Sequence, residues 1–393
     1  MIPFPAMADR VTTGNGTEPT TFERAYERQR TLPAAWYTRA EALEREQEQV
    51  FERSWQYAGF LGNLGEPGQF VTSRLGRVPA VVVRGKDGEL RAFVNVCRHR
   101  GSEVVLEHAG CRQTLQCMYH GWTYDLDGTL RRAPRTREED LDPAELSLQP
   151  LHVDTLGPFA FVSADPGAEP LSRVAEAWPD LVREMRLDLS GLVFRERRTY
   201  DVAANWKILV ENFLECYHCP VSHHGFSALI DLSSYEGEIH SDLFWHFSSC
   251  AREAAVVANA HGIGELPEAR RRLWNYVLWP NFMANVYPGG GNISTNLLLP
   301  VAPDRTLAIY DFYFEHGVPE ERQRANVEFI DEVQREDIVL CESVQRGLAS
   351  GRFDRGRLLD SEVFLDRFAF QVARAVTGDP GPAPADAPAS VRL

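Results

Sequence analysis

Two cysteine–histidine pairs in the sequence have the composition of a metal site. His99 follows Cys97 after one residue, and His120 follows Cys117 after two, so that each pair fits in one short loop. A glycine comes within two residues of each histidine, as expected where a loop turns back after a strand. Two thiolates and two imidazoles together make a four-ligand set for a soft or borderline metal.

The spacing of these pairs favours one kind of metal site over another. Structural zinc sites usually place roughly two to four residues between their cysteines and three to five between their histidines. Here each loop offers one cysteine and one histidine. That arrangement fits a Rieske [2Fe–2S] cluster, in which two histidines replace two cysteines on one iron. We therefore predict that Cys97, His99, Cys117 and His120 hold such a cluster, with structural zinc as the alternative.

A second group of metal-ligating side chains follows about a hundred residues later. We predict a helix over Trp206–Cys219 that ends at Pro220, because proline disfavours the helical conformation of the residue before it. Glu215 and His218 are three residues apart and would share a helix face. His223 follows the break, where a turn can bring it back beside His218. Two histidines and one carboxylate are the ligands of non-heme Fe(II) oxygenases.

The missing carboxylate is sought on a long helix predicted over Pro319–Ser350, which carries several acidic residues. Advancing about 100° per residue, Asp337 falls inside the apolar stripe of this helix, and Glu336 falls at its edge. Asp331, Glu332 and Glu342 fall well outside it. A carboxylate on a buried face needs a partner. We predict that Asp337 is the third iron ligand, with a hydrogen-bonded structural aspartate as the alternative.

Because it carries both the two Cys–His pairs and the group of two histidines and a carboxylate, the chain resembles the large subunit of Rieske non-heme iron ring-hydroxylating oxygenases. The matching segments are Cys97-Arg-His-Arg-Gly and Cys117-Met-Tyr-His-Gly-Trp. The resemblance implies His223 rather than His224 as the second iron histidine, because the family leaves four residues between the two. It also places an acidic ligand in a C-terminal helix. The segment around Glu215 looks more like the branch that oxidises choline, carnitine and betaine.

The same resemblance implies a homotrimer with electron transfer between subunits. His120 of one subunit would reach Glu215 and His218 of the next, and Glu215 would bridge the two centres. Electrons from NAD(P)H would come through a separate reductase or ferredoxin, since no glycine-rich nucleotide motif is present. The implied reaction uses O2 to hydroxylate or N-demethylate a small organic substrate, and a quaternary ammonium compound is one candidate.

The pattern of apolar residues changes at about residue 170, from short β-prone runs to longer helical repeats. This change predicts two domains, and together they are of α+β class. Short β-prone runs with Asp-Gly turns predict an antiparallel β Rieske domain over 36–168. Longer helical patterns beside aromatic strands predict a catalytic domain over 169–377, with helices packed on an antiparallel sheet. Residues 1–35 are predicted to form a loose N-terminal arm, and 378–393 a disordered tail.

Composition excludes several classes of function. The 393 residues include 41 Lys and Arg and 56 Asp and Glu, a formal net charge of −15, which argues against binding nucleic acid or anionic membranes. No apolar run is long enough for a membrane span, and no secretion leader is recognisable, so a cytoplasmic location is expected. Five of the seven cysteines, Cys216 and Cys219 among them, are expected to be packing thiols.

Aromatic residues after position 240 could line an apolar pocket for an aromatic substrate, form a cage for a quaternary ammonium, or be plain core. The sequence therefore leaves three other functions open. The chain could be a dioxygenase or hydroxylase of an aromatic compound. Remoter alternatives are a Rieske electron carrier that uses only the first site, and a zinc-stabilised binding module.

Overall fold

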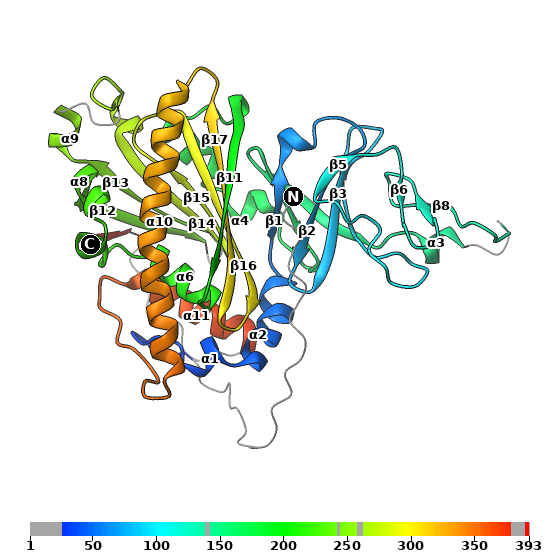
Figure 1. Ribbon diagram of the computed structural model, residues 1–393, viewed down its shortest axis with the longest axis horizontal. Coiled ribbons are helices and arrows are strands. Elements are labelled where there is room, and N and C mark those ends of the chain that lie inside the picture. The colour runs from blue at the N-terminus through cyan, green and yellow to red at the C-terminus, as the bar shows by residue number, and fades with distance from the viewer. Residues whose placement is uncertain (1–25, 138–141, 242–243, 258–261, 379–389, 393) are drawn as a thin grey trace. The chain divides into compact units, whose positions relative to one another are not determined.

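Figure 1 shows the computed structural model, which describes residues 26–137, 142–241, 244–257, 262–378 and 390–392. The described chain divides into two units: residues 47–174 form the first, and residues 26–46 with 175–392 form the second. The boundary predicted from the sequence between the arm and the first domain is at residue 35, whereas the division between the two units falls after residue 46. Residues 1–25 of the predicted arm and 379–389 of the predicted tail lie outside the described residues. In the described part, no helix combines the length and the apolar character needed to cross a bilayer.

The first unit is built from short antiparallel strands, as predicted. A seven-stranded sheet has the order β1-β10-β9-β4-β3-β2-β5, and a three-stranded sheet has the order β6-β7-β8. The predicted Asp-Gly turns join β3 to β4 and β7 to β8, with Gly88 and Gly128 at positive φ. The strands are β1 Gln56–Phe60, β2 Gln69–Leu75, β3 Val78–Arg84, β4 Leu90–Val94, β5 Ala109–Cys111, β6 Leu115–Gln116, β7 Thr123–Tyr124, β8 Leu130–Arg132, β9 Pro150–Leu156 and β10 Phe159–Ser163. The helical segments are η1 Gln47–Phe51, η2 Leu61–Asn63, α3 Pro143–Leu146 and α4 Leu171–Val174.

The second unit contains one antiparallel sheet of eight strands in the order β11-β17-β16-β15-β14-β13-β12-β18. The strands are β11 Leu192–Val202, β12 Ile230–Ser241, β13 Phe244–Ala251, β14 Arg272–Leu278, β15 Phe282–Val286, β16 Asn292–Ala302, β17 Arg305–Glu315 and β18 Ser390–Arg392. The last of these lies within the predicted tail and pairs with Glu236–Glu238 of β12. The α+β class predicted from the sequence is confirmed.

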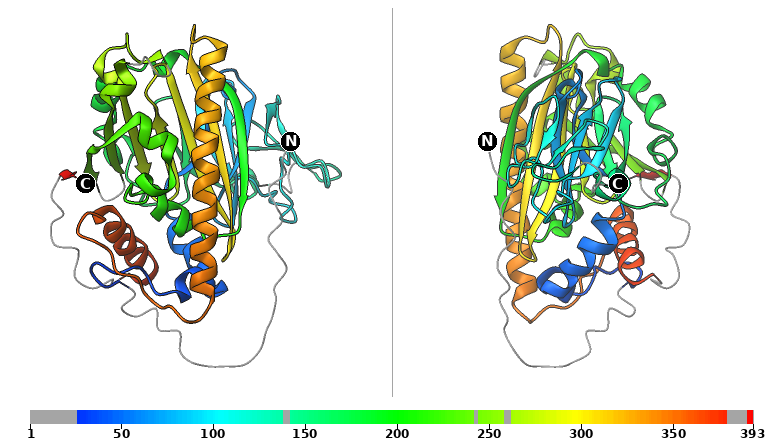
Figure 2. Two further views of the ribbon diagram at one scale, coloured as in Figure 1. Left: turned by 60° about the vertical axis from the view of Figure 1, so that its left-hand side comes forward. Right: turned by 90° about the vertical axis from the view of Figure 1, so that its right-hand side faces the viewer.

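Helices cover both faces of this sheet. Figures 1 and 2 show α10, drawn in orange, running along one face. The helices of the unit are α1 Ala35–Thr38, α2 Ala40–Glu46, α5 Trp178–Met185, α6 Trp206–Phe213, α7 Cys219–Ser222, α8 His224–Leu229, α9 Glu253–Val257, α10 Glu320–Ala349 and α11 Val363–Thr377, with short 3₁₀ turns η4 Leu189–Gly191 and η6 Glu268–Arg271. The long helix predicted over 319–350 is thus present as α10.

Alternate residues of each strand face opposite sides of the sheet, and this separates two cavities. On β13, Phe247 and Ser249 line a cavity on the α10 side. His246 and Ser248, their neighbours in sequence, line another cavity on the α5 side. The same strand therefore supplies side chains to two separate sites.

The helix predicted over Trp206–Cys219 is shorter than expected: α6 ends at Phe213. The Glu215 carboxylate accepts hydrogen bonds from the backbone N–H groups of Tyr217 and His218. Those groups would otherwise bond to carbonyls one turn earlier, so the side chain competes directly with continuation of the helix. His218 consequently lies in the turn just before the short helix α7, and His223 lies between α7 and α8, so the two histidines are not on one long helix.

A buried ion pair fixes the start of α6. Lys207 and Glu46 are both fully buried, with Nζ and Oε1 2.6 Å apart. The indole N–H of Trp206 donates to the other oxygen of Glu46 at 2.7 Å. Burial raises the pKa of Glu46 and lowers that of Lys207, so each charge depends on its partner. The pair joins α2 to α6, the helix that leads into the second predicted metal site.

Candidate metal centres

The two loops of the first site fold in the same way. The backbone N–H of Gly101 donates to the carbonyl of Cys97, and that of Gly121 donates to Cys117, each at 3.0 Å. Both glycines have positive φ, 78° and 73°, a conformation that residues with a Cβ rarely adopt. The sequence signal of a glycine after each pair thus corresponds to two matching tight turns.

These loops bring the four predicted ligands together. Cys97 and Cys117 are each 2 % exposed, and burial beside Cys117 raises the pKa of the Cys97 thiol. The rings of His99 and His120 are exposed, with centroids 4.6 Å apart. Two sulfurs inside and two imidazoles outside fit a cluster with one buried iron held by thiolates and one outer iron held by histidines.

A tyrosine supports the inner side of this site. The Tyr124 hydroxyl lies 3.3 Å from Cys97 Sγ and accepts a hydrogen bond from the backbone N–H of Arg98. Trp122 stacks on the ring of His99, with planes 6° apart and centroids 5.0 Å apart. Tyr124 was not singled out from the sequence, and Trp122 was named there only as the last residue of the second matching segment.

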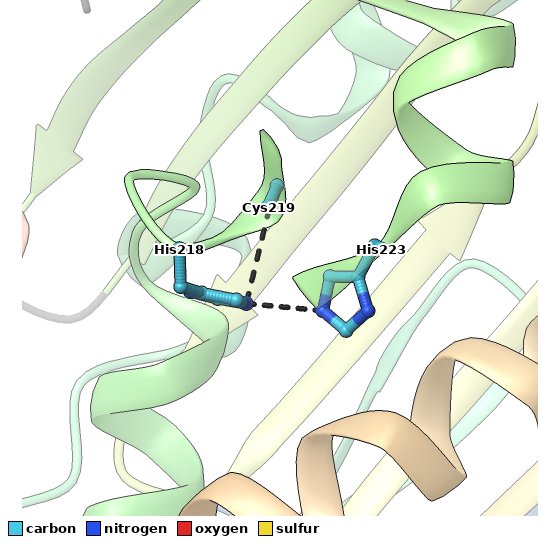
Figure 3. A group of neighbouring side chains, drawn as sticks. All are labelled: His218, Cys219 and His223. Carbon is cyan, nitrogen blue, oxygen red and sulfur yellow. Dashed lines mark hydrogen bonds between the residues drawn. The ribbon is translucent and has the colours of Figure 1, made fainter. Parts of the chain in front are cut away.

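The second site is a triangle of three ligand atoms. His218 Nε2 and His223 Nε2 are 3.1 Å apart, and Figure 3 shows the two rings approaching each other. Asp337 Oδ1 is 2.9 Å from His223 Nε2 and 3.3 Å from His218 Nε2. Three cis positions of an octahedral metal with bonds of about 2.1 Å are about 3.0 Å apart. The three atoms therefore fit one face of an octahedral site and leave the opposite face open.

Two carboxylates orient the histidines from behind. His218 Nδ1 is 2.5 Å from Glu215 Oε1, and His223 Nδ1 is 2.6 Å from Glu336 Oε2. A carboxylate on Nδ1 fixes the tautomer and turns Nε2 toward the metal. The pKa of His218 is raised to about 9 by Asp337 and Glu215 against the opposing effect of burial. The carboxylates thus place negative charge around the two imidazoles, which favours a bound cation there.

The structure separates the candidates that the sequence left close together. His223 is buried, whereas His224 is exposed. Asp337 contacts both histidines, but Glu336, which helical phase placed at the edge of the apolar stripe, holds His223 from behind. Phase indicates the face of a helix and not the reach of a side chain, so the sequence did not reveal the part played by Glu336.

A cavity of about 90 Å³ adjoins the three ligand atoms, in the space between the sheet and α10. It is lined on several sides by aromatic rings: Phe213, Phe226, Tyr235, Phe247, Tyr287 and Tyr310. No lysine or arginine belongs to its lining among the described residues. Tyr235 Oη, Ser249 Oγ and Asn296 Oδ1 are buried there without a hydrogen-bond partner in the described part of the chain. Such groups accept or donate to a polar ligand.

The cysteines differ from expectation in two respects. Cys216 and Cys219, expected as packing thiols, form a disulfide beside this cavity. The turn after α6 brings their Cα atoms within 5.0 Å, a separation that permits the bond. Cys111 is exposed rather than packed, whereas Cys341 is buried as expected.

Comparisons with known proteins match both units. Residues 54–153 match the Rieske [2Fe-2S] domain, and residues 189–378 match the ring hydroxylating alpha subunit (catalytic domain). Choline monooxygenase from Arabidopsis thaliana is 34% identical over 84% of this chain and 79% of its own length. The carnitine monooxygenase oxygenase subunit of Escherichia coli is 33% identical over 84% of this chain and 87% of its own length.

Solved structures give the same picture. The quaternary ammonium Rieske monooxygenase CntA with L-carnitine has a TM-score of 0.76 at 30% identity, covering 88% of this chain and 96% of that one. Naphthalene 1,2-dioxygenase from a Rhodococcus species has a TM-score of 0.73 at 19% identity, over 89% and 95% of the two chains, and shows the fold alone. The matched domains confirm the predicted cofactors, a Rieske [2Fe–2S] cluster and a mononuclear iron, over structural zinc.

Proposed function

Since this chain belongs to the family of Rieske non-heme iron oxygenases, we propose that it oxidises a small quaternary ammonium compound with O2. The cluster would supply electrons one at a time, and the mononuclear iron would supply the activation of O2. Cys97 and Cys117 would hold the inner iron of the cluster, and His99 and His120 the outer one. The mononuclear iron would be held by His218, His223 and Asp337.

The observation that carries the substrate class is the lining of the cavity beside the triad. Its six aromatic rings and the absence of lysine and arginine from its described lining favour a cation. Aromatic faces attract an alkylammonium group, by about 0.5–2 kcal/mol for each ring. A carnitine-like or betaine-like carboxylate would find no positive partner there. A hydroxyl would find Tyr235, Ser249 and Asn296, which lack partners among the described residues. The preferred substrate is therefore an amino alcohol of the choline type.

The residues around the iron would divide the remaining work. Glu215 and Glu336 hold the Nδ1 protons of the two histidines, so that Nε2 of each stays free to bind the metal. The aromatic lining would exclude bulk water and orient the substrate. Glu215 would also link the iron of one subunit to His120 of its neighbour in a homotrimer, with a separate NAD(P)H-dependent reductase or ferredoxin as the electron donor in the cytoplasm.

The test is turnover with a panel of matched substrates. Protein with both iron centres loaded, and a reductase to supply electrons, is given choline, glycine betaine, carnitine and the neutral isostere 3,3-dimethylbutanol. Oxygen uptake is measured with the aldehyde or formaldehyde formed. We expect uptake coupled to product with choline above the two carboxylates, and none with the isostere.

Two controls make the result decisive. His218→Ala, which removes one iron ligand but leaves the Rieske loops intact, should lose product formation and keep the Rieske EPR signal. Equal turnover of the isostere and choline would contradict recognition of the cation. Coupled hydroxylation of aromatic acids in place of the ammonium compounds would instead support the aromatic alternative.

A further inference from the structure

A second cavity lies on the α5 side of the eight-stranded sheet, away from the iron triad. Its volume is about 810 Å³, and α5, η6 and strands β12–β14 contribute its walls. None of its lining residues lines the cavity beside the triad. The proposed oxygenase reaction uses no group in it, so its chemistry needs a separate explanation.

A histidine–histidine–carboxylate cluster forms part of the wall of this cavity. Glu238 and His240 come from β12, and His246 comes from β13 directly opposite Glu238 in the sheet register. One ligand atom from each of the three lies within 4.8 Å of the other two. Because strand residues two apart share a face, the sequence Glu-Ile-His on β12 presents two of these ligands side by side.

The two imidazoles meet nitrogen to nitrogen. His240 Nε2 is 2.7 Å from His246 Nδ1, and their ring planes are within 16° of parallel. At this distance one nitrogen must carry a lone pair, so both rings are not charged together. The iron triad has the same arrangement of two close imidazole nitrogens beside a carboxylate, with His218 Nε2 and His223 Nε2 3.1 Å apart. The second cluster therefore repeats the donor set of the first on the opposite face of one sheet.

The rings are held from the side of the sheet. His246 is 7 % exposed and lies beside Trp274, with ring planes 27° apart and centroids 6.3 Å apart. His240 is partly exposed and Glu238 is exposed, so these two ligands can adjust. A tetrahedral zinc ion with bonds of about 2.0–2.1 Å spaces its ligands about 3.3–3.4 Å apart. Small rotations of His240 and Glu238 would meet that spacing around a fixed His246.

The charge of the cavity wall favours a cation. Five carboxylates line it, those of Asp180, Glu184, Glu236, Glu238 and Glu268, against three guanidinium groups. Arg272 is engaged with Glu236 at 2.6 Å, and Arg183 with Asp180 at 2.5 Å. The wall thus keeps an excess of negative charge, and Glu238 contributes to that excess next to the two imidazoles.

We propose that Glu238, His240 and His246 form a binding site for a divalent transition-metal ion. The donor set is that of His₂Glu zinc sites, which keep a fourth position for water or another ligand. Zn²⁺ is therefore the metal that we assign, and its open position would face the 810 Å³ cavity. An imidazole–imidazole hydrogen bond that only packs the sheet is the alternative to be tested.

The experiment counts zinc on the full-length protein with both iron centres loaded. Zn²⁺ is titrated against a competing chromophoric chelator, and zinc and iron per chain are then measured by elemental analysis. We expect wild-type protein to bind one zinc per chain without losing iron. His240→Ala should weaken this binding by more than the roughly 10–100-fold that loss of an outer-shell partner costs, and Glu238→Gln should weaken it as well.

Controls separate the site from unspecific binding and from misfolding. Glu268→Gln removes an exposed carboxylate of the same cavity outside the cluster and should leave zinc binding unchanged. The two main variants change side chains that are not fully buried, and their Rieske EPR signal reports on the integrity of the holoprotein. X-ray absorption at the zinc edge should show two imidazoles and no sulfur. Equal zinc binding by wild type and His240→Ala, or sulfur in the zinc shell, would overturn the proposal.

Discussion

At the scale of single residues, each histidine of the triad is fixed at both ring nitrogens. Nε2 faces the shared centre while Nδ1 is held by a carboxylate, Glu215 for His218 and Glu336 for His223. The two supports come from different elements, a turn after α6 and the middle of α10. The metal-binding geometry therefore depends on side chains that would not touch the metal.

Glu336→Gln tests this dependence. The amide keeps the shape of the side chain but not its charge, so the support of His223 weakens. Loss of such an outer partner costs about 10–100-fold in metal affinity or activity. We expect mononuclear iron to fall in an iron titration while the Rieske EPR signal persists. Glu332→Gln, an exposed change one turn earlier on α10, should have no effect; equal behaviour of the two variants would refute the role.

Tyr124→Phe tests the support of the cluster. The Tyr124 hydroxyl lies 3.3 Å from Cys97 Sγ, and a hydrogen bond to sulfur stabilises the reduced, more negative cluster. A bond worth about 0.5–1.5 kcal/mol corresponds to roughly 20–65 mV for one electron. We expect the reduction potential to fall by this amount in an EPR-monitored titration. Tyr119→Phe, beside His120 on the exposed side, serves as the unshifted control.

Residue types and spacing indicated the candidate ligands and Glu215, but not the other residues that support the ligands. Asp337 stood out because a charged side chain interrupts an apolar stripe. Glu336, Tyr124 and Trp122 carry no such conflict in the sequence, since each is an ordinary residue for its place. Their contacts come from chain segments far apart in sequence or from loop turns, which periodicity does not describe.

At the scale of elements, the buried pair of Glu46 and Lys207 ties α2 to the start of α6. Lys207→Met leaves the Glu46 carboxylate buried without its cation. Breaking a buried pair in this way costs about 3–5 kcal/mol, which we expect to see as a lower free energy of unfolding in urea titrations. Arg305→Met breaks the exposed pair with Asp201 and should cost less than about 1 kcal/mol. Similar losses in both variants would contradict the structural role.

Long elements were predictable and the short turns between them were not. The apolar repeat of α10 extends over many turns and fixes both its presence and its phase. The backbone conformation of residues 214–218 is instead determined by one side chain. Glu215 accepts hydrogen bonds from the backbone N–H groups that a continuing helix would use. Competition between one side chain and the helical backbone for hydrogen bonds produces no periodic pattern of apolar residues, so the sequence pattern does not indicate where the helix ends.

At the scale of the whole molecule, the proposed homotrimer makes a specific claim about which cluster serves which iron. Cys97→Ala removes the cluster but leaves the triad, and His223→Ala does the reverse. Each variant alone should be inactive. After subunit exchange at equal amounts, transfer around a closed ring of three should restore about a quarter of wild-type product formation. Half of the subunits then carry an intact iron site, and half of these have a neighbour with an intact cluster.

The control for this experiment mixes His223→Ala with Asp337→Ala, which both lack the iron site and should stay inactive. Mass spectrometry of the mixture confirms that subunits have exchanged. No recovery in exchanged trimers would mean that electrons pass within one chain, and the bridging role of Glu215 between subunits would be abandoned.

The alternation of side chains along β12–β14 has a practical consequence for redesign. Substitutions at Phe247, Ser249, Leu273 and Asn275 reshape only the cavity at the triad, whereas His246, Ser248 and Trp274 belong to the opposite face. A library restricted to every second codon of these strands can therefore search for new substrates while the other face keeps its inherited sequence. An insertion of one residue would exchange the two faces and destroy both sites at once.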